Sequence, residues 1–244
     1  MNQSLFTLTE SLPLAPGVTL WLLTGDCSAI TKPGQFVNIA LDGFFLRRPI
    51  SVCDCEDNAL TLIFKTVGHG TAAMEKMQPG QRLDLLTGLG NGYDTAKTGS
   101  RPLLIGGGAG VPPMFLLAKT LLKEGKNPAV ILGFNKKDEI FFENEFKSLG
   151  IDTFVTTVDG SCGIRGFVTD AMKEVPDYTY TCACGPEPML KAVYNTAGTS
   201  GQYSFEERMG CGFGACMGCS CKTKYGNKRI CKDGPVLEKE EILW

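Results

Sequence analysis

Residues 211–231 read CGFGACMGCSCKTKYGNKRIC and contain five of the 11 cysteines of the chain. Four of them, Cys211, Cys216, Cys219 and Cys231, are separated by gaps of four, two and eleven residues. The segment is rich in glycine, and a unit of about 40 residues is too small to fold around an apolar core of its own. We therefore expect a metal centre or a partner to stabilise the C-terminal part of the chain.

The spacing of these cysteines favours a [2Fe-2S] cluster. A C-x4-C-x2-C run followed by a distant fourth cysteine is the ligand pattern of plant-type clusters. Structural zinc sites more often combine two C-x2-C pairs, and only one such pair occurs here. Zinc, and thiols without any metal, remain the alternatives. Cys221 lies two residues after Cys219 and is left out of the predicted set, because the other four cysteines fit the pattern better.

The composition indicates a globular chain with balanced charge. It has 244 residues, 24 basic and 26 acidic side chains, and a formal net charge of −2. Nucleic-acid binding needs clustered Lys and Arg, so we expect no nucleic-acid partner. The first ten residues lack a secretory signal, and the longest uncharged stretch, residues 102–118, is too short and too interrupted by glycine and proline to span a membrane. We expect a cytoplasmic protein without a membrane segment.

Two regular patterns precede the cysteine segment. Between Val18 and about Asp94, short apolar runs are separated by turn residues, which predicts an antiparallel β-barrel. From about Ser100 to Thr196, strand-like and helix-like segments alternate, which predicts an α/β parallel-sheet domain. The predicted domains are therefore a barrel (1–98), an α/β domain (99–200) and a small C-terminal cluster domain (201–244). The predicted strands are 18–23, 35–41, 60–67, 82–86, 103–105, 129–134, 153–158 and 179–183, and the predicted helices are 113–123, 139–149, 167–174 and 187–196.

A glycine-rich turn follows the first strand of the α/β pattern. Gly106, Gly107, Gly108 and Gly110 let phosphate oxygens approach backbone amides at the start of a helix. The full motif G-x-G-x-x-G is absent, because Val111 stands at the position of its third glycine. From this loop alone, a nucleotide site and a tight strand-to-helix turn both remain open.

Cys184, Gly185 and Pro186 follow the last predicted strand of this domain. Ligands of open α/β sheets bind at the carboxyl ends of the strands. One interpretation therefore has the Cys184 thiol beside a nicotinamide ring. The other has a small thiol buried in the strand.

Arg47 and Arg48 precede Pro49–Ser51. In an extended strand, adjacent side chains point to opposite faces, so that one arginine reaches a groove and the other reaches solvent. An arginine beside a serine suits a diphosphate, and a plain surface pair is the alternative. His69, the only histidine, lies between two glycines and has no evident catalytic partners.

Taken in order, these motifs resemble one family along nearly the whole chain, the ferredoxin-reductase-like electron-transfer subunits of class 1B dihydroorotate dehydrogenase. The cysteine tail combined with the Arg-Pro-Ile-Ser element is the most specific part. The glycine loop and the Cys-Gly-Pro element are shared by many flavin reductases. The matching segments are 33–36, 48–51, 70–71, 90–92, 106–113, 159–161, 184–186 and 207–235.

The resemblance implies FAD on the barrel, NAD on the α/β domain and a [2Fe-2S] cluster on the four cysteines. Asp159 and the lack of an arginine pair after the second strand of this domain favour NAD, and NADP remains open. The expected FAD residues are Arg48, Pro49, Ile50, Ser51, Ile63, Phe64, Lys65, Gly70 and Thr71. The expected NAD residues are Gly106, Gly107, Gly108, Gly110, Asp159, Gly185 and Pro186, with Cys184 beside the nicotinamide.

The resemblance also implies a partner. An FMN-containing TIM-barrel subunit is expected to oxidise dihydroorotate in pyrimidine biosynthesis, in a heterotetramer with two copies of each chain, and to pass electrons through the cluster and FAD to NAD+. This chain alone is not expected to oxidise dihydroorotate. A reductase subunit of a hydrogenase or of a ferredoxin:NADP reductase would carry the same cofactors. A zinc-stabilised nucleotide-sensing module is the alternative from a different class.

Overall fold

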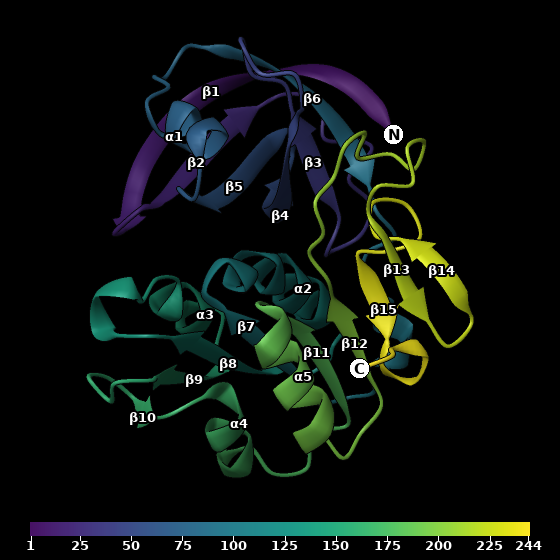
Figure 1. Cartoon of the computed structure of the whole chain (residues 1–244). Coiled ribbons are helices and arrows are strands. Elements are labelled where there is room, and N and C mark those ends of the chain that lie inside the picture. The colour runs from purple at the N-terminus through teal and green to yellow at the C-terminus, as the bar shows by residue number, and fades with distance from the viewer.

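The computed structural model describes all 244 residues. A β-barrel and an α/β unit lie one above the other in Figure 1, and the C-terminal segment runs along one side of both. This arrangement confirms the predicted fold class.

The barrel is closed and has the strand order β1-β2-β5-β4-β3-β6. Side chains of alternate residues point inward, and a core around Trp21, Phe6 and Leu8 fills the barrel. The four predicted strands are present, whereas β1, β4 and the short helix α1 were not predicted. The elements are β1 (Asn2–Ala15), β2 (Val18–Thr24), β3 (Phe36–Ile39), β4 (Arg48–Glu56), β5 (Ala59–Lys65), α1 (His69–Glu75) and β6 (Arg82–Leu89).

The α/β unit contains a seven-stranded sheet of order β10-β9-β8-β7-β11-β12-β15. All neighbouring strands are parallel except β12 and β15. Apart from β9 and β10, which a short turn joins, the strands from β7 to β12 are separated by crossover segments that carry helices, as the alternation predicts. The elements are β7 (Pro102–Gly107), α2 (Val111–Lys123), β8 (Ala129–Phe134), α3 (Glu143–Ser148), β9 (Asp152–Thr157), β10 (Ile164–Arg165), α4 (Val168–Ala171), β11 (Tyr180–Cys184), α5 (Glu187–Thr196) and β12 (Gly201–Ser204).

The helix predicted at 139–149 is only partly present. Lys137–Glu139 form a 3-10 turn, and α3 begins at Glu143. Phe142 between them has a left-handed backbone with φ of 65°, which interrupts a helix. Phe141 and Phe142, in the loop before α3, are nevertheless buried in the core. The apolar pattern that predicts one continuous helix therefore arises from a buried loop followed by a short helix.

The C-terminal segment contributes to the main sheet and adds a small hairpin. Strands β13 (Ser220–Thr223) and β14 (Gly226–Arg229) form the hairpin beside the cysteines. Strands β12 and β15 (Val236–Glu238) pair with each other at the edge of the sheet, so the sheet continues across the predicted boundary at residue 200. Further 3-10 turns lie at Thr95–Lys97, Gly108–Gly110, Met172–Glu174 and Lys239–Glu241.

Polar contacts join the barrel to the α/β unit. Lys119 of α2 binds two carboxylates of β4, Asp54 at 2.6 Å and Glu56 at 3.1 Å. The Tyr93 hydroxyl, fully buried, donates to the Ala183 carbonyl at 2.9 Å. These contacts hold the barrel against the carboxyl-end side of the sheet. No helix of the structure has both the length and the apolar character needed to cross a membrane.

Candidate functional site

The loop from Cys211 to Cys219 folds around sulfur atoms. The Cys211 sulfur accepts hydrogen bonds from the backbone N–H groups of Ala215 (3.2 Å) and Cys216 (3.4 Å). The Cys216 sulfur accepts from the N–H groups of Gly218 and Cys211, both at 3.5 Å. Backbone donors aimed at sulfur stabilise thiolates and tune the potential of iron-sulfur clusters.

Glycine makes this wrapping possible. Gly212 and Gly214 have φ angles of 77° and 93°, in the left-handed region that glycine adopts without strain. A Cβ on Gly212 would lie 2.2 Å from the Asn38 side-chain nitrogen, and one on Gly214 would lie 2.6 Å from Lys232. The loop is therefore packed against the barrel strand β3 on one side and against the segment around Cys231 on the other.

The four predicted ligands form two pairs. Cys211 and Cys216 are joined by the hydrogen bonds described above, and the Cys231 N–H donates to the Cys219 sulfur at 3.4 Å. Burial, and then the adjoining Cys219 thiol, raise the pKa of Cys231 to about 12. At Cys211 burial acts to raise the pKa, but the backbone N–H groups of Cys216 and Phe213 outweigh it, and the pKa falls to about 6.

This donor set fits a cluster with two irons. Cys211 with Cys216 and Cys219 with Cys231 supply four thiols in two pairs, and four thiolates are the ligand set of a [2Fe-2S] cluster. Cys221 lies on β13 opposite Lys228 and lines a different cleft, together with Phe205 and Trp244. Its exclusion from the predicted set agrees with this position.

Arg48 and Gly70 meet at the rim of the barrel. The Arg48 guanidinium packs over the Phe44 ring at 4.8 Å from its centroid, and a Cβ on Gly70 would lie 1.9 Å from Arg48 Nε. Gly70 is thus needed for the close approach of the arginine. The structure brings two expected FAD residues together although 21 positions separate them in the sequence.

Arg47 does not extend freely into solvent as the sequence analysis expected. Its guanidinium binds the Asp84 carboxylate through two hydrogen bonds, at 2.9 and 3.1 Å, and also donates to the Asn38 carbonyl. This Arg47 contact lowers the pKa of Asp84. Arg47 therefore fastens β3 to β6, and Arg48 is the arginine of the pair that faces the expected FAD site.

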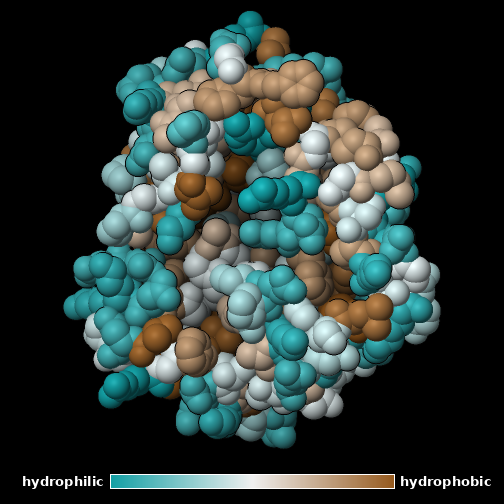
Figure 2. All heavy atoms as spheres, viewed as in Figure 1, coloured by the Kyte–Doolittle hydropathy of each residue, from teal (hydrophilic) through white to brown (hydrophobic).

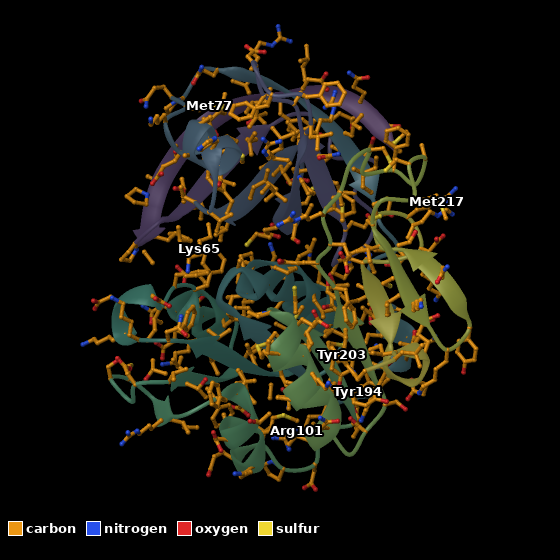
Figure 3. All side chains as sticks on the ribbon, in the orientation of Figure 1. Lys65, Met77, Arg101, Tyr194, Tyr203 and Met217 are labelled. Atoms are coloured by element: carbon orange, nitrogen blue, oxygen red, sulfur yellow. The ribbon has the colours of Figure 1, made fainter.

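The side chains of the other expected FAD residues differ in their exposure and direction. Phe64 packs edge-on against Trp21 inside the barrel, with ring centroids 5.0 Å apart, so its side chain points away from the rim. Lys65 is exposed and faces the α/β unit (Figure 3). The Thr71 hydroxyl accepts from the Val67 and Gly68 N–H groups and so closes the turn before α1. Pro49, Ile50 and Ser51 are half-buried on β4.

The glycine loop serves two purposes. Gly106, Gly107 and Gly110 are buried, and a Cβ on them would meet, respectively, Val111 at 2.8 Å, the Met189 sulfur at 2.4 Å and the Cys184 carbonyl oxygen at 2.1 Å. Gly108, with φ of 51°, has open space around it. Three of the glycines therefore allow tight packing, and Gly108 leaves backbone accessible at the start of α2.

Part of each predicted nucleotide region lines one crevice. A pocket between the barrel and the α/β unit is lined by Ile63, Lys65, Gly108 and Ala109, together with Phe134 and Phe141. Figure 2 shows the surface hollowed between these two parts of the molecule. The expected FAD strand β5 and the expected NAD loop therefore lie on opposite walls of the same crevice.

The Cys184 thiol is covered by the protein. It is 2% exposed at the end of β11, between Gly106 on β7 and Ser204 on β12. Burial raises its pKa to about 12, and the carboxylate of Glu206 acts in the same direction. The position matches the packing alternative of the sequence analysis, and contact with nicotinamide stays a prediction.

The buried thiol predicts a pH effect on stability. Because the pKa of Cys184 rises from 9.0 to about 12 on folding, the unfolded chain releases a proton above pH 9 that the folded chain retains. The free energy of unfolding should therefore fall as pH increases from 9 toward 12, with a Cys184 contribution of about 1 kcal/mol lost by pH 10. Urea unfolding at pH 8 and pH 10 measures this loss. Cys184→Ala should reduce the difference between the two pH values, and an unchanged difference would contradict the assignment.

Asp159, Gly185 and Pro186 lie at the carboxyl edge of the sheet. The Asp159 carboxylate accepts from the Ser161 hydroxyl at 2.6 Å and from its N–H at 2.9 Å, and these bonds lower the pKa of Asp159. Gly185, with φ of 155°, packs against Met189, and Pro186 is the N-cap residue of α5. All three follow strand ends, where α/β sheets bind ligands.

Residues 206–243 match the family model of the iron-sulfur cluster binding domain of dihydroorotate dehydrogenase B, and residues 104–195 match that of the oxidoreductase NAD-binding domain. Over the whole chain, identity is 41% to the dihydroorotate dehydrogenase B (NAD(+)) electron transfer subunit of Geobacillus sp. strain WCH70, with 100% of this chain and 99% of the relative covered. The chain belongs to this family of electron transfer subunits.

Two further comparisons agree with this membership and confirm the resemblance found in the sequence. The electron transfer subunit of dihydroorotate dehydrogenase B from Fusobacterium nucleatum is 47% identical, with 97% of this chain and 96% of the relative covered. A chain of the solved NADH-dependent reduced ferredoxin-NADP oxidoreductase superposes with a TM-score of 0.89 at 30% identity, covering 98% of this chain and 89% of that chain.

Sequence reasoning missed two polar residues of this electron transfer subunit. Asn38 contacts the cysteine loop. The sequence feature that could have marked it is a single amide side chain within the apolar run 36–40. Glu206 lies in a cleft beside Pro186, and its partial desolvation raises its pKa. No local pattern marked Glu206, because its proximity to Cys184 comes from the pairing of β11 with β12.

Proposed function

We propose that this chain accepts electrons from an FMN-containing TIM-barrel subunit, which oxidises dihydroorotate, and passes them to NAD+. The two subunits form a heterotetramer with two copies of each. The proposal extends the family membership to a named partner, to an assembly and to individual residues. One observation supports it most strongly. The cysteines form two pairs with backbone N–H groups directed at their sulfur atoms, and the loop that carries them packs against the barrel that contains Arg48.

When bound, the cluster supplies one-electron steps and the flavin connects these to the hydride chemistry of NAD+. The four cysteines hold the cluster, and the Ala215 and Cys216 amides stabilise charge on sulfur. Arg48 gives the FAD diphosphate a positive partner, and the open backbone at Gly108 and the N-terminus of α2 give NAD a phosphate site. Asp159 would hold a ribose hydroxyl of NAD, and Gly185 and Pro186 would lie on the nicotinamide side, beside Cys184.

In this proposal the two nucleotides would meet along this crevice, where small residues form part of the α/β wall. Gly108 and Ala109 present backbone rather than side chains toward Lys65 and Ile63 of the barrel. The contacts of Lys119 with β4 keep the two walls in one arrangement. Reacting rings held in a fixed geometry gain rate by orientation rather than by acid-base catalysis.

The division of labour is tested with the purified chain. Alone and anaerobic, it should reduce dyes with NADH and leave dihydroorotate untouched. Addition of the FMN subunit should start dihydroorotate-dependent reduction of NAD+. Oxidation of dihydroorotate by the isolated chain would overturn the proposal, as would failure of the FMN subunit to bind it.

We propose that the partner docks over the cysteine loop. Phe213 and Met217 of this loop are 43% and 55% exposed. Phe45, 100% exposed, lies in the loop that follows β3, the strand whose Asn38 contacts Cys211. Figure 3 shows Met217 at the outer edge of the loop, and Figure 2 shows apolar residues gathered over this part of the molecule. Exposed apolar side chains beside a redox centre suit a protein interface.

Phe45→Glu is expected to weaken binding of the FMN subunit by about 30-fold, the effect of losing an aromatic anchor of about 2 kcal/mol. NADH-dependent dye reduction should not change, since Phe45 lies outside the crevice. Val67→Glu is the control, because Val67 is 80% exposed in a different loop of the barrel, between β5 and α1. Calorimetric titration with the partner measures both variants, and equal affinities would contradict this docking surface.

A second candidate partner follows from one comparison. The superposition with the NADH-dependent reduced ferredoxin-NADP oxidoreductase chain favours a reductase subunit of a ferredoxin:NADP reductase type as the second candidate, for which we expect a multi-cluster partner. Co-purification separates the two candidates, because a single FMN subunit supports dihydroorotate and a multi-cluster partner supports the second candidate. We also assign the complex to the cytoplasm, since all 11 cysteines are free thiols, as in a reducing compartment.

A further inference from the structure

Asn38 is a buried amide in an apolar strand. Its side chain is 1% exposed on β3, and the residues around it in the run 36–40 are all apolar. Its Nδ2 donates to the carbonyl of Cys211 at 3.3 Å, across 173 positions of sequence. Its Oδ1 is buried without a hydrogen-bond partner. Buried polar groups in this state are rare and mark positions with a function beyond packing.

The same residue touches the expected flavin strand. Asn38 pairs with Pro49 of β4, next to Arg48, and its carbonyl accepts from Arg47 at 3.3 Å. On the loop side, Gly212 approaches so closely that a Cβ would meet Nδ2 at 2.2 Å. Asn38 is therefore in contact with both the strand that carries Arg48 and the loop that carries the first cysteine.

We propose that Asn38 is a positioning residue that fixes the cluster-binding loop against the flavin-binding strand. The inference rests on the proposed function, since it assigns the cluster to Cys211 and its partners and FAD to β4. The Asn38 amide holds the loop through its hydrogen bond to the Cys211 carbonyl. Its unpaired Oδ1 is available to a hydrogen-bond donor in the protein loaded with FAD and cluster. Leucine in its place would leave the Cys211 carbonyl without its hydrogen bond. Aspartate would place a carboxylate oxygen, which is also an acceptor, against the Cys211 carbonyl oxygen.

The test compares Asn38→Leu and Asn38→Asp with Thr87→Val in the full chain loaded with FAD and cluster. Thr87 is equally buried in the barrel and bonds only to the Asn2 carbonyl. Iron release to a chelator should accelerate about tenfold in both Asn38 variants, the effect of losing one buried hydrogen bond. After mixing with NADH, flavin reduction should keep its rate while the following cluster reduction slows. Thr87→Val should change neither rate.

Gly212→Ala provides a second variant should the Asn38 variants fail to fold. It breaks the same contact from the loop side. Gly226→Ala is its control, because Gly226 also has a positive φ (109° against 77° at Gly212) and therefore a comparable backbone strain, but has open space around its Cβ. The inference is overturned if Asn38→Leu releases iron and reduces the cluster at wild-type rates. The same result in Gly212→Ala overturns it if that is the only variant that folds. A wild-type chain without a cluster would instead overturn the proposed function on which it rests.

Discussion

Replacing Cys219 with serine is expected to remove the cluster and to lower dihydroorotate-dependent NAD+ reduction by more than about 100-fold. Cys219 is buried at 2% exposure and accepts the Cys231 N–H, so it links the C-x2-C end of the loop to the distant fourth cysteine. A serine oxygen is harder than a thiolate and does not hold iron with the same strength. FAD binding and NADH-dependent dye reduction should remain, because neither uses this loop.

Cys221→Ser is the matched control. Cys221 lies two residues away on β13, faces the cleft with Phe205 and Trp244, and is not one of the proposed ligands. Iron and sulfide content, together with NAD+ reduction in the presence of the FMN subunit, should be those of the wild type. Loss of the cluster in Cys221→Ser, or its retention in Cys219→Ser, would contradict the ligand assignment.

The second large effect is expected at Gly110. In Gly110→Ala the new methyl group would lie 2.1 Å from the Cys184 carbonyl oxygen and 2.6 Å from the Gly185 nitrogen. Both atoms belong to backbone, so the contact is relieved only if the start of α2 moves away from β11. A shift of about 1 Å in a positioned site costs about 100-fold in rate. NADH-dependent reduction of the flavin, followed by stopped-flow absorbance, should slow by that order.

Gly108→Ala tests whether this effect comes from packing. Gly108 lies two residues before Gly110, and a methyl group added to it would have no neighbour within 4 Å, although its φ of 51° costs an alanine about 1 kcal/mol. We expect a modest loss of stability, weaker binding of NADH because Gly108 borders the proposed phosphate site, and a nearly normal rate of flavin reduction once NADH is saturating. If both variants slow flavin reduction equally at saturating NADH, the loop acts through its flexibility and not through the contact with Cys184.

Regular patterns made much of the fold predictable. The alternation of apolar runs with turns indicated the barrel, and α5 and β8 have the predicted bounds. Strand β1 was missed because it contains Pro13 and many exposed residues, and β4 because its residues are mostly half-buried. Helix α1 is too short for a helical period to emerge from its sequence.

The candidate site was predictable where the chemistry is local in sequence. The spacing of four cysteines within 21 residues identified the cluster loop, and the fold around it supplied N–H donors that no spacing reveals. The contacts of Asn38 with Cys211, of Arg48 with Gly70 and of Gly110 with Cys184 join distant segments. They arise from strand pairing and loop docking, so a local sequence pattern contains no trace of them.

The central claim is that the cysteines near the C-terminus hold a [2Fe-2S] cluster that exchanges electrons with NADH through the flavin. Anaerobically purified protein, reduced with NADH and frozen, tests it by electron paramagnetic resonance alongside iron and sulfide analysis. We predict the signal of a reduced cluster and about two irons and two sulfides per chain. A colourless protein that contains zinc, no acid-labile sulfide and no signal would contradict the account.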